Sequence, residues 1–510
     1  MGRLILLLFL FAPFCVAFFM EDNHDYYKKL ALQHMRQKLD SHFGKKMMQL
    51  EAPPKNVILF VGDGMGLTAV KGARVAINQK NNVPDVDEPL FFETFPWSGI
   101  VKPGLGEKCE KKGAAAINDG ITDHAVAKGI SVGVVSTAAV TDAIPAAAYA
   151  KDVHRYMAYD DDKDIRGTEC TDIARQALMH PANKFKVLFG GGKKFFTPKS
   201  VDGGVRTDGK NLMDEFKTEG KNRFVVTNKK ELDGHTVEMD QQVLGLFAPK
   251  DMSYKVVDDA KNDRTFERSQ SDLMDMTKKA IHILERQSNS PGYFLLVEGA
   301  MIDKAEHDNR FAFAQEETEE FDKTIKMVSN LVGDDTLMLV TADHSHALAI
   351  LGMWYKNRSI YEQDMVLTNL PQIFFATGPG KFNPDPETFR FNETEAIDKF
   401  FMNPAAKSLG YNTHGGEDVG IWAKGPYAWL FSGTIENTQI AHGIKYLMCL
   451  NDDNICDLRK QQNAEGTPIG TPSFSPFTLI MIVLCVHSLL LLYLLKRYNQ
   501  NPRSRSENLH

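Results

Sequence analysis

The sequence has no excess of positive charge and no internal repeat. Its formal net charge is −7 at pH 7, with 59 lysine and arginine residues against 66 aspartate and glutamate residues. Surfaces that bind nucleic acid are strongly basic, so we expect no nucleic-acid partner. Low-complexity segments are also missing from residues 50–450. A hydrophobic fraction of 43% and a charged fraction of 25% are typical of a globular protein instead.

Cysteine is scarce, at six residues in 510. Two of the six lie in apolar runs near the chain ends, and the four that remain are Cys109, Cys170, Cys449 and Cys456. An even number of cysteines suits disulfide bonding in an oxidising compartment. We predict that Cys449 pairs with Cys456 across a short loop, and that Cys109 pairs with Cys170.

Long apolar runs occur at the two ends of the chain. Residues 1–18 combine Arg3, an apolar run and small residues near Ala17, which is the pattern of a cleaved secretory signal peptide. Residues 477–495 carry no formal charge and would rise about 28 Å as a helix, close to the thickness of the hydrocarbon core of a membrane. The basic tail at residues 496–510 favours a cytoplasmic C-terminus.

The apolar run at residues 477–495 has a second interpretation. Small polar residues around 463–470, followed by an apolar tail, are typical of a lipid-anchor signal. We favour a single-pass membrane anchor because the chain continues beyond the apolar run. Residues 457–476 would then be a polar linker, and the protein would face the outside of the cell. Glycosylation sequons at Asn357 and Asn392 agree with this location.

Short apolar runs alternate with helical patterns over the rest of the chain. The first run, at residues 57–62, ends in Gly62 and reads as a strand buried on both faces. Alternating strands and helices predict an α/β fold with a large central, mostly parallel sheet and helices on both faces. We expect one large domain, at residues 22–456. The other predicted strands are at residues 131–137, 186–189, 292–297 and 336–341, and the predicted helices are at 22–50, 273–287 and 315–331.

Acidic residues and histidines follow several of the predicted strands. A single one could be a helix cap or a surface group, but four clusters at strand ends or loops favour a ligand site. Asp303 and His307 are four residues apart, so they share one face of a helix. Oxygen and imidazole donors without thiolates suit zinc at histidine-rich positions and magnesium at carboxylate-rich ones. The candidates are Asp63, Glu298, Asp303, His307, Asp343, His344, His346 and His414.

Longer motifs carry a family resemblance. The chain resembles the alkaline phosphatases, especially the animal membrane-bound kind, over almost the whole of the predicted secreted portion. The similarity includes Val-Gly-Asp-Gly-Met-Gly at residues 61–66 and Thr-Ala-Asp-His-Ser-His at residues 341–346. The other matching motifs, in the order of the family, are at residues 131–137, 145–150, 190–193, 206–212, 244–247, 297–299 and 413–419.

The resemblance implies a hydrolase of phosphate monoesters that contains two zinc ions and one magnesium ion. It also implies phosphate monoesters or inorganic phosphate as ligands, and a homodimer. Asp63 would extend from the second zinc ion towards magnesium, and Glu298 would be a magnesium ligand. The implied ligands of the first zinc ion are Asp303, His307 and His414, and those of the second are Asp63, Asp343 and His344.

Four further positions follow from the same resemblance. Arg155 would grip two phosphate oxygens, a task that suits the planar guanidinium group. His346 would contact zinc ligands and help to orient them, without binding zinc itself. Asp142 occupies a position that is His in vertebrate members and Asp in bacterial ones. Ile144 replaces a Ser or Thr that ligates magnesium, so we expect weakened magnesium binding.

One family feature is absent from the sequence. The family has a nucleophilic serine in an Asp-Ser-Ala segment that precedes the cysteine matching Cys109. Between Asp63 and Cys109 the hydroxyl side chains are Thr68, Thr94 and Ser98, and none has this context. The alternative to an active phosphatase is therefore an inactive member that retains a zinc and phosphate site. The segment could be lost by evolution, by splicing or in the gene model.

Overall fold

The computed structural model describes ten stretches of the chain. The predicted signal peptide, the apolar run at 477–495, the basic tail, Arg155, Cys109 and the sequon asparagines Asn357 and Asn392 lie outside the described residues. In the described stretches, no helix combines the length and the apolar character that crossing a membrane requires. The described residues are 24–43, 51–103, 120–151, 156–161, 170–256, 270–352, 358–362, 371–381, 398–451 and 454–465.

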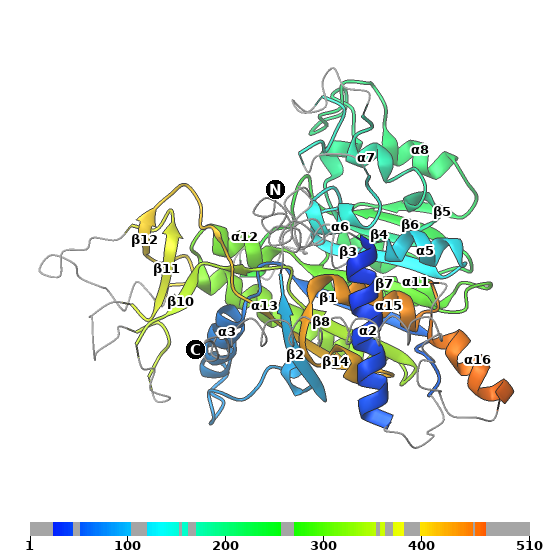
Figure 1. Cartoon of the computed structure of the whole chain (residues 1–510). Helices are drawn as coiled ribbons and strands as arrows, with labels where there is room; N and C mark the ends of the chain where they lie inside the picture. The colour runs from blue at the N-terminus through cyan, green and yellow to red at the C-terminus, as the bar shows by residue number, and fades with distance from the viewer. Residues whose placement is uncertain are drawn as a thin grey trace, which may run out of the picture.

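A ten-stranded sheet forms the centre of the molecule (Figure 1). Neighbouring strands are parallel except around β14, which runs antiparallel to both β2 and β8. This confirms the predicted α/β fold with a mostly parallel sheet. In sheet order the strands are β15 (Gly433–Glu436), β2 (Trp97–Lys102), β14 (Val419–Lys424), β8 (Thr336–Thr341), β1 (Asn56–Gly62), β7 (Tyr293–Gly299), β3 (Ser131–Ala139), β4 (Val187–Gly191), β6 (Gln242–Leu246) and β5 (Arg223–Val226).

The four central strands, β8, β1, β7 and β3, are buried along their whole length. Their apolar residues contact helices or loops on both faces of the sheet, which is why they form continuous apolar runs in the sequence. The register pairs Val61 of β1 with Glu298 of β7 and with Thr341 of β8. The carboxyl ends of these three strands therefore lie side by side.

Two groups of helices cover the sheet. In the first, α13 packs on α11, α12 and α3, and α11 and α13 contact the central strands. In the second, α15 packs on α2 and α5. The helices are α2 (His24–Phe43), α3 (Leu67–Lys80), α5 (Ile121–Ala127), α6 (Ala143–Ala147), α7 (Ile173–Gln176), α8 (Leu212–Thr218), α9 (Lys229–Gly234), α11 (Leu273–Glu285), α12 (Met301–His307), α13 (Phe311–Leu331), α15 (Asn437–Leu447) and α16 (Ile455–Glu465).

Two smaller sheets lie near the carboxyl end of β8. A three-stranded sheet of β10 (Leu348–Ile350), β11 (Ile373–Gly378) and β12 (Ala405–Ser408) stands at the left of Figure 1. A two-stranded ladder pairs β9 (Ser345–His346) with β13 (His414–Gly415), and it places His346 opposite His414. The sequence analysis did not predict these short strands.

The predicted disulfide between Cys449 and Cys456 is present, with a Cα–Cα distance of 5.9 Å. It closes the short loop between α15 and α16. Cys170 is exposed, and its predicted partner, Cys109, lies outside the described residues.

Asp322 on α13 makes stability depend on pH. Its Oδ1 accepts a hydrogen bond from the Phe92 backbone N–H at 3.0 Å. Burial, together with the charge of Glu93, raises the pKa of Asp322 to about 6. The unfolded chain loses this proton near pH 4, so the folded state loses stability as the pH rises from about 4 to about 6.

We expect Asp322→Asn, which keeps an acceptor for Phe92, to be more stable than the wild type by about 1–3 kcal/mol near neutral pH. This advantage should shrink towards zero as the pH falls to about 4, because the wild-type carboxyl is then neutral in both states. Urea unfolding at the two pH values measures the difference. Asp334→Asn, at an exposed position, is the matched control and should be neutral at both. Destabilisation of Asp322→Asn near pH 7 would contradict the prediction.

Candidate metal centre

The adjacent ends of β1, β7 and β8 carry most of the predicted site residues. Asp63 directly follows β1, and Glu298 is the penultimate residue of β7. Helix α12 begins two residues after β7 and presents Asp303 and His307 one turn apart. The remaining predicted residues from these strands are Asp343 and His344, which follow β8, and His346 in β9.

Asp303 is the centre of the arrangement and is only 3% exposed. His346 Nε2 lies 2.6 Å from its Oδ1, and His307 Nε2 lies 3.4 Å from its Oδ2. His414 Nε2 and His344 Nε2 lie 3.6 and 4.0 Å from Oδ1. Burial alone would raise the pKa of Asp303, but the hydrogen bond from His346 and the nearby charge of Lys304 hold this pKa well below its usual range. Four imidazoles therefore surround one ionised carboxylate.

Backbone carbonyls fix the tautomers of two of these histidines. His307 Nδ1 lies 2.6 Å from the carbonyl oxygen of Asn412, and His344 Nδ1 lies 3.1 Å from that of Ser345. A carbonyl only accepts, so each Nδ1 carries the proton and each Nε2 directs its lone pair into the site. Burial and the nearby His344 lower the pKa of His414 to about 3, which keeps this imidazole neutral. Neutral imidazoles are the form that binds a metal ion.

The donor atoms form two groups that share one residue. In each group the donor atoms lie within 4.8 Å of one another. Asp343 lies beside the second group, because its Oδ2 is 3.3 Å from His344 Nε2. Its Oδ1 accepts hydrogen bonds from the backbone N–H groups of Gly64 and His344. The first group is Asp303, His307, His346 and His414, and the second is Asp63, Asp303 and His344.

Gly64 allows β1 to approach these groups closely. It has a φ of +72°, and a Cβ at this position would lie 2.6 Å from the Cδ2 atom of His346. Any other residue would be strained here and would displace the imidazole that binds Asp303. This explains why glycine follows Asp63 in the sequence.

Negative charge gathers at one side of the centre. Burial and the Asp303 and Asp343 carboxylates raise the pKa of Asp63 well above its usual range. Burial also raises the pKa of Glu298, although a hydrogen bond from the Ser136 hydroxyl opposes the shift. Carboxyl groups whose ionisation is opposed in this way favour a nearby cation.

The residues predicted for magnesium are arranged differently from those predicted for zinc. Asp142 Oδ1 accepts a hydrogen bond from the Ala143 backbone N–H at 2.8 Å. Its Oδ2 forms an ion pair with Lys304 Nζ at 3.1 Å. Ile144 is buried and offers no donor atom. Within the part of the chain that the structure describes, neither metal-binding group includes Glu298 or Asp142.

The sequence analysis missed Lys304 and Asn412. Burial would lower the pKa of Lys304, but the charges of Asp142, Asp63 and Asp303 raise it well above its usual range. Asn412 Nδ2 lies 3.1 Å from His346 Nδ1, and its backbone oxygen holds His307. Their positions in the sequence could have indicated that they belong to the site, because Lys304 directly follows Asp303 and Asn412 lies two residues before His414.

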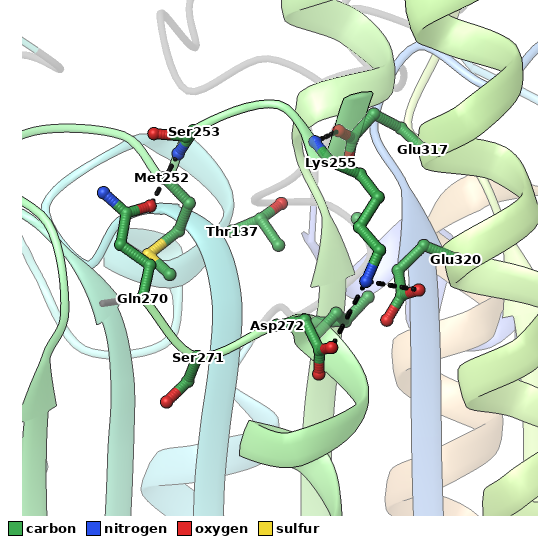
Figure 2. Close-up of a pocket in the computed structure, with 11 residues that line it drawn as sticks. Thr137, Met252, Ser253, Lys255, Gln270, Ser271, Asp272, Glu317 and Glu320 are labelled. Carbon is green, nitrogen blue, oxygen red and sulfur yellow. Dashed lines mark hydrogen bonds and ion pairs between the residues drawn. The ribbon is translucent and has the colours of Figure 1, made fainter. Parts of the chain in front are cut away.

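A second cluster of carboxylates lies beside the carboxyl end of β7. Figure 2 shows Lys255 between Asp272 and Glu320, with its Nζ 3.3 and 3.4 Å from their carboxylate oxygens. Thr137 and Gly299, the residues that follow Ser136 and Glu298, line the same pocket. Here an internal lysine supplies the positive charge that buried carboxylates require.

Comparisons with known proteins agree on one family. The family model for alkaline phosphatase matches residues 54–116 and 112–450. The tissue-nonspecific alkaline phosphatase of Gallus gallus is 30% identical over 536 residues, which cover 94% of this chain and 99% of that protein. The membrane-bound alkaline phosphatase of Bombyx mori is 30% identical, over 80% of this chain and 82% of its own length.

Solved structures show the same fold at lower identity. The alkaline phosphatase of Thermus thermophilus has a TM-score of 0.56 at 19% identity, covering 81% of this chain and 96% of its own. That of the Antarctic bacterium TAB5 has a TM-score of 0.52 at 20% identity, covering 78% of this chain and 100% of its own. A variant of the TAB5 enzyme with Mg bound in its M3 site has a TM-score of 0.51 at 21% identity, covering 79% and 99%.

Proposed function

Because this chain belongs to the alkaline phosphatase family, we propose that it is a metal-dependent phosphatase that acts on phosphate monoesters outside the cell. The observation that carries the proposal is the convergence of four imidazoles on the buried Asp303 carboxylate. Hydrolysis of phosphate monoesters is the activity of the family. The metal dependence and the location are the parts that we add.

The donor atoms around Asp303 fit zinc. Imidazole nitrogen and carboxylate oxygen are its usual ligands in proteins. His346 would donate its Nε2 proton to Asp303 and so hold the carboxylate in place. Bound zinc would supply stabilisation of the attacking and leaving oxygens in a displacement at phosphorus. The first zinc site would use Asp303, His307 and His414, and the second would use Asp63, Asp343 and His344.

The remaining residues of the proposed site orient ligands or bind phosphate. Asn412 fixes the His307 tautomer, so that Nε2 faces the site. The rings of His344 and His414 are stacked with centroids 3.6 Å apart, so the two imidazoles lie side by side. Arg155, outside the described residues, would bind two oxygens of the phosphate group.

Magnesium fits the structure less well than zinc. Asp142 is already bound to Lys304 and to backbone, one oxygen of Glu298 is held by the Ser136 hydroxyl, and the Ile144 side chain has no oxygen. No step of the proposed reaction therefore depends on magnesium.

An inactive family member is the second candidate function. It is favoured by the missing Asp-Ser-Ala segment, which deprives the chain of the family nucleophile. Ser345 lies between two site histidines but is 1% exposed and packs against Gly66, so it cannot reach a substrate. In this case the centre would bind zinc and phosphate without normal turnover.

The proposed surface location has two supports. The Cys449–Cys456 disulfide is typical of a secreted chain, and a relative from Bombyx mori is described as membrane-bound. A single-pass anchor at residues 477–495 and a lipid anchor both remain compatible with these observations. We also propose a homodimer, on family grounds alone.

Metal removal tests the proposed function. Full-length protein purified from animal cells in detergent should contain about two zinc ions per chain, because two groups of donors are preformed. Chelation should lower its thermal midpoint by several degrees and abolish any turnover of p-nitrophenyl phosphate, and zinc should restore both. Magnesium added alone is the control and should restore neither. A protein purified without zinc, and unable to take it up, would overturn the proposal.

A further inference from the structure

A groove lies at the edge of the sheet opposite to the metal centre. It borders the amino ends of β1 and β7, since Lys55 directly precedes β1 and Gly292 directly precedes β7. The candidate metal centre stands at the carboxyl ends of the same two strands. Each strand is seven residues long and rises about 3.3 Å per residue, so the two places are about 20 Å apart. The groove is therefore separate from the centre that would bind substrate.

The groove is lined mainly by apolar side chains, and its volume is about 420 Å³. This volume is within the range of about 300–1,000 Å³ that is usual for ligand sites. Leu447 and Met448 at the end of α15 are buried, and Ile130 before β3 is half-buried. Both cysteines of the Cys449–Cys456 disulfide also line the groove. The disulfide therefore fixes the start of α16 against the end of α15 at this place.

Lys55 and Lys128 are the charged residues among the described residues that line the groove. Both are exposed, and within the described part of the chain neither ammonium group is in an ion pair. Asp457 is close enough to Lys128 for an electrostatic interaction, but its carboxylate has its own partner, Lys460 Nζ, at 3.0 Å. The groove thus combines apolar surface with positive charge, which is complementary to an amphiphile with an anionic head group.

The last described helix begins beside this groove. Cys456 lines the groove and is the second residue of α16, which Figure 1 shows at the lower right, apart from α12. Residues 466–476 then separate α16 from the apolar run at residues 477–495. An extended chain spans at most about 3.6 Å per residue, so this run begins within about 40 Å of the end of α16. A lipid anchor near residues 463–470 would be closer still. An anchor of either kind would hold the groove near the membrane surface.

We propose that the groove binds a phospholipid of the membrane that carries the anchor, with the lipid phosphate at Lys55 and Lys128. The apolar part of the lipid would pack against Ile130, Leu447 and Met448. The inference rests on the proposed location and goes beyond the proposed activity. Because the groove and the metal centre are at opposite ends of β1 and β7, a chain bound in this way would hold the metal centre on the side away from the membrane, open to soluble phosphate monoesters.

Photochemical labelling tests the proposal. Full-length protein is reconstituted into phosphatidylcholine vesicles that contain a small fraction of a photoactivatable phosphatidylserine, irradiated, reduced and digested. We expect label on the peptides that contain residues 53–55 and 447–456, in addition to label on the membrane anchor. Label confined to the anchor would overturn the proposal, and an acidic peptide that binds the groove without lipid would then be the better occupant. Zinc content, measured on the same sample, tests the proposed function independently of the label.

Charge reversal of the two lysines is the complementary test. The double variant Lys55→Glu, Lys128→Glu should reduce label in the groove peptides by at least about tenfold, because it replaces attraction to the lipid phosphate by repulsion. Both positions are exposed, so its zinc content and thermal midpoint should match those of the wild type. Lys278→Glu, Lys407→Glu, which reverses two exposed lysines elsewhere, is the matched control and should be labelled as the wild type is. A folded groove variant with undiminished label would overturn the proposal and leave the proposed function intact.

Discussion

Replacement of Asp303 by asparagine is expected to weaken zinc binding at the proposed first zinc site, by about 100-fold. Asp303 is the residue that the two groups share, and its Oδ1 is the hydrogen-bond partner of His346. The amide removes a negative charge that four imidazoles surround. The amide also places either an N–H group or a neutral oxygen where a bound zinc ion would need a carboxylate oxygen.

Competition with a chromogenic zinc chelator measures this loss. Asp308→Asn, five residues along the chain and exposed, is the matched control and should keep the zinc affinity of the wild type. Thermal unfolding in excess zinc shows whether the Asp303→Asn chain is folded. A folded variant that retained both zinc ions would show that the centre is not built around Asp303.

The second large effect concerns the covalent step. We expect no phosphorylated form of this protein to accumulate with p-nitrophenyl phosphate, and a turnover at least about 1,000-fold below that of a serine-containing relative. The sequence holds no serine, threonine or tyrosine from residue 99 to residue 121. Upstream, the Thr94 hydroxyl donates a hydrogen bond to the Phe91 carbonyl oxygen at 2.6 Å.

Acid quenching after mixing with a phosphate-labelled substrate detects such an intermediate. The serine-containing relative, assayed at the same zinc concentration, is the positive control and should retain label. Residual turnover without retained label would indicate direct attack by water at the metal centre. Stoichiometric labelling of this chain would contradict the prediction and would identify a different nucleophile.

The buried strands could be predicted because burial on both faces leaves a simple pattern. β1, β7 and β8 are mostly apolar, and each has an acidic residue at or just beyond its carboxyl end. The edge of the sheet was harder to predict. Half of the residues of β2 and of β15 are exposed, and without an apolar run their pairing depends on contacts far along the chain.

The candidate site shows the same limit. Spacing alone predicted that Asp303 and His307 share one face of a helix, because the period of a helix is local. That His414 lies opposite His346 depends on the β9–β13 ladder, whose strands are two residues long. The ion pair between Lys304 and Asp142 joins residues 162 positions apart. No local pattern in the sequence encodes such a contact.

The loop before His414 has a consequence for the synthesis of the protein. Thr377 of β11 binds the Asn412 side chain and receives a hydrogen bond from the Thr413 backbone N–H, at 3.0 and 2.9 Å. The last histidine is therefore positioned by the small sheet, which the ribosome completes only after the strands of the main sheet up to β8. A nascent chain can assemble Asp303, His307 and His346 earlier, but it lacks the fourth donor. Zinc would then be captured only after residue 414 has been made, when β14 and β15 are the strands of the main sheet still to be added.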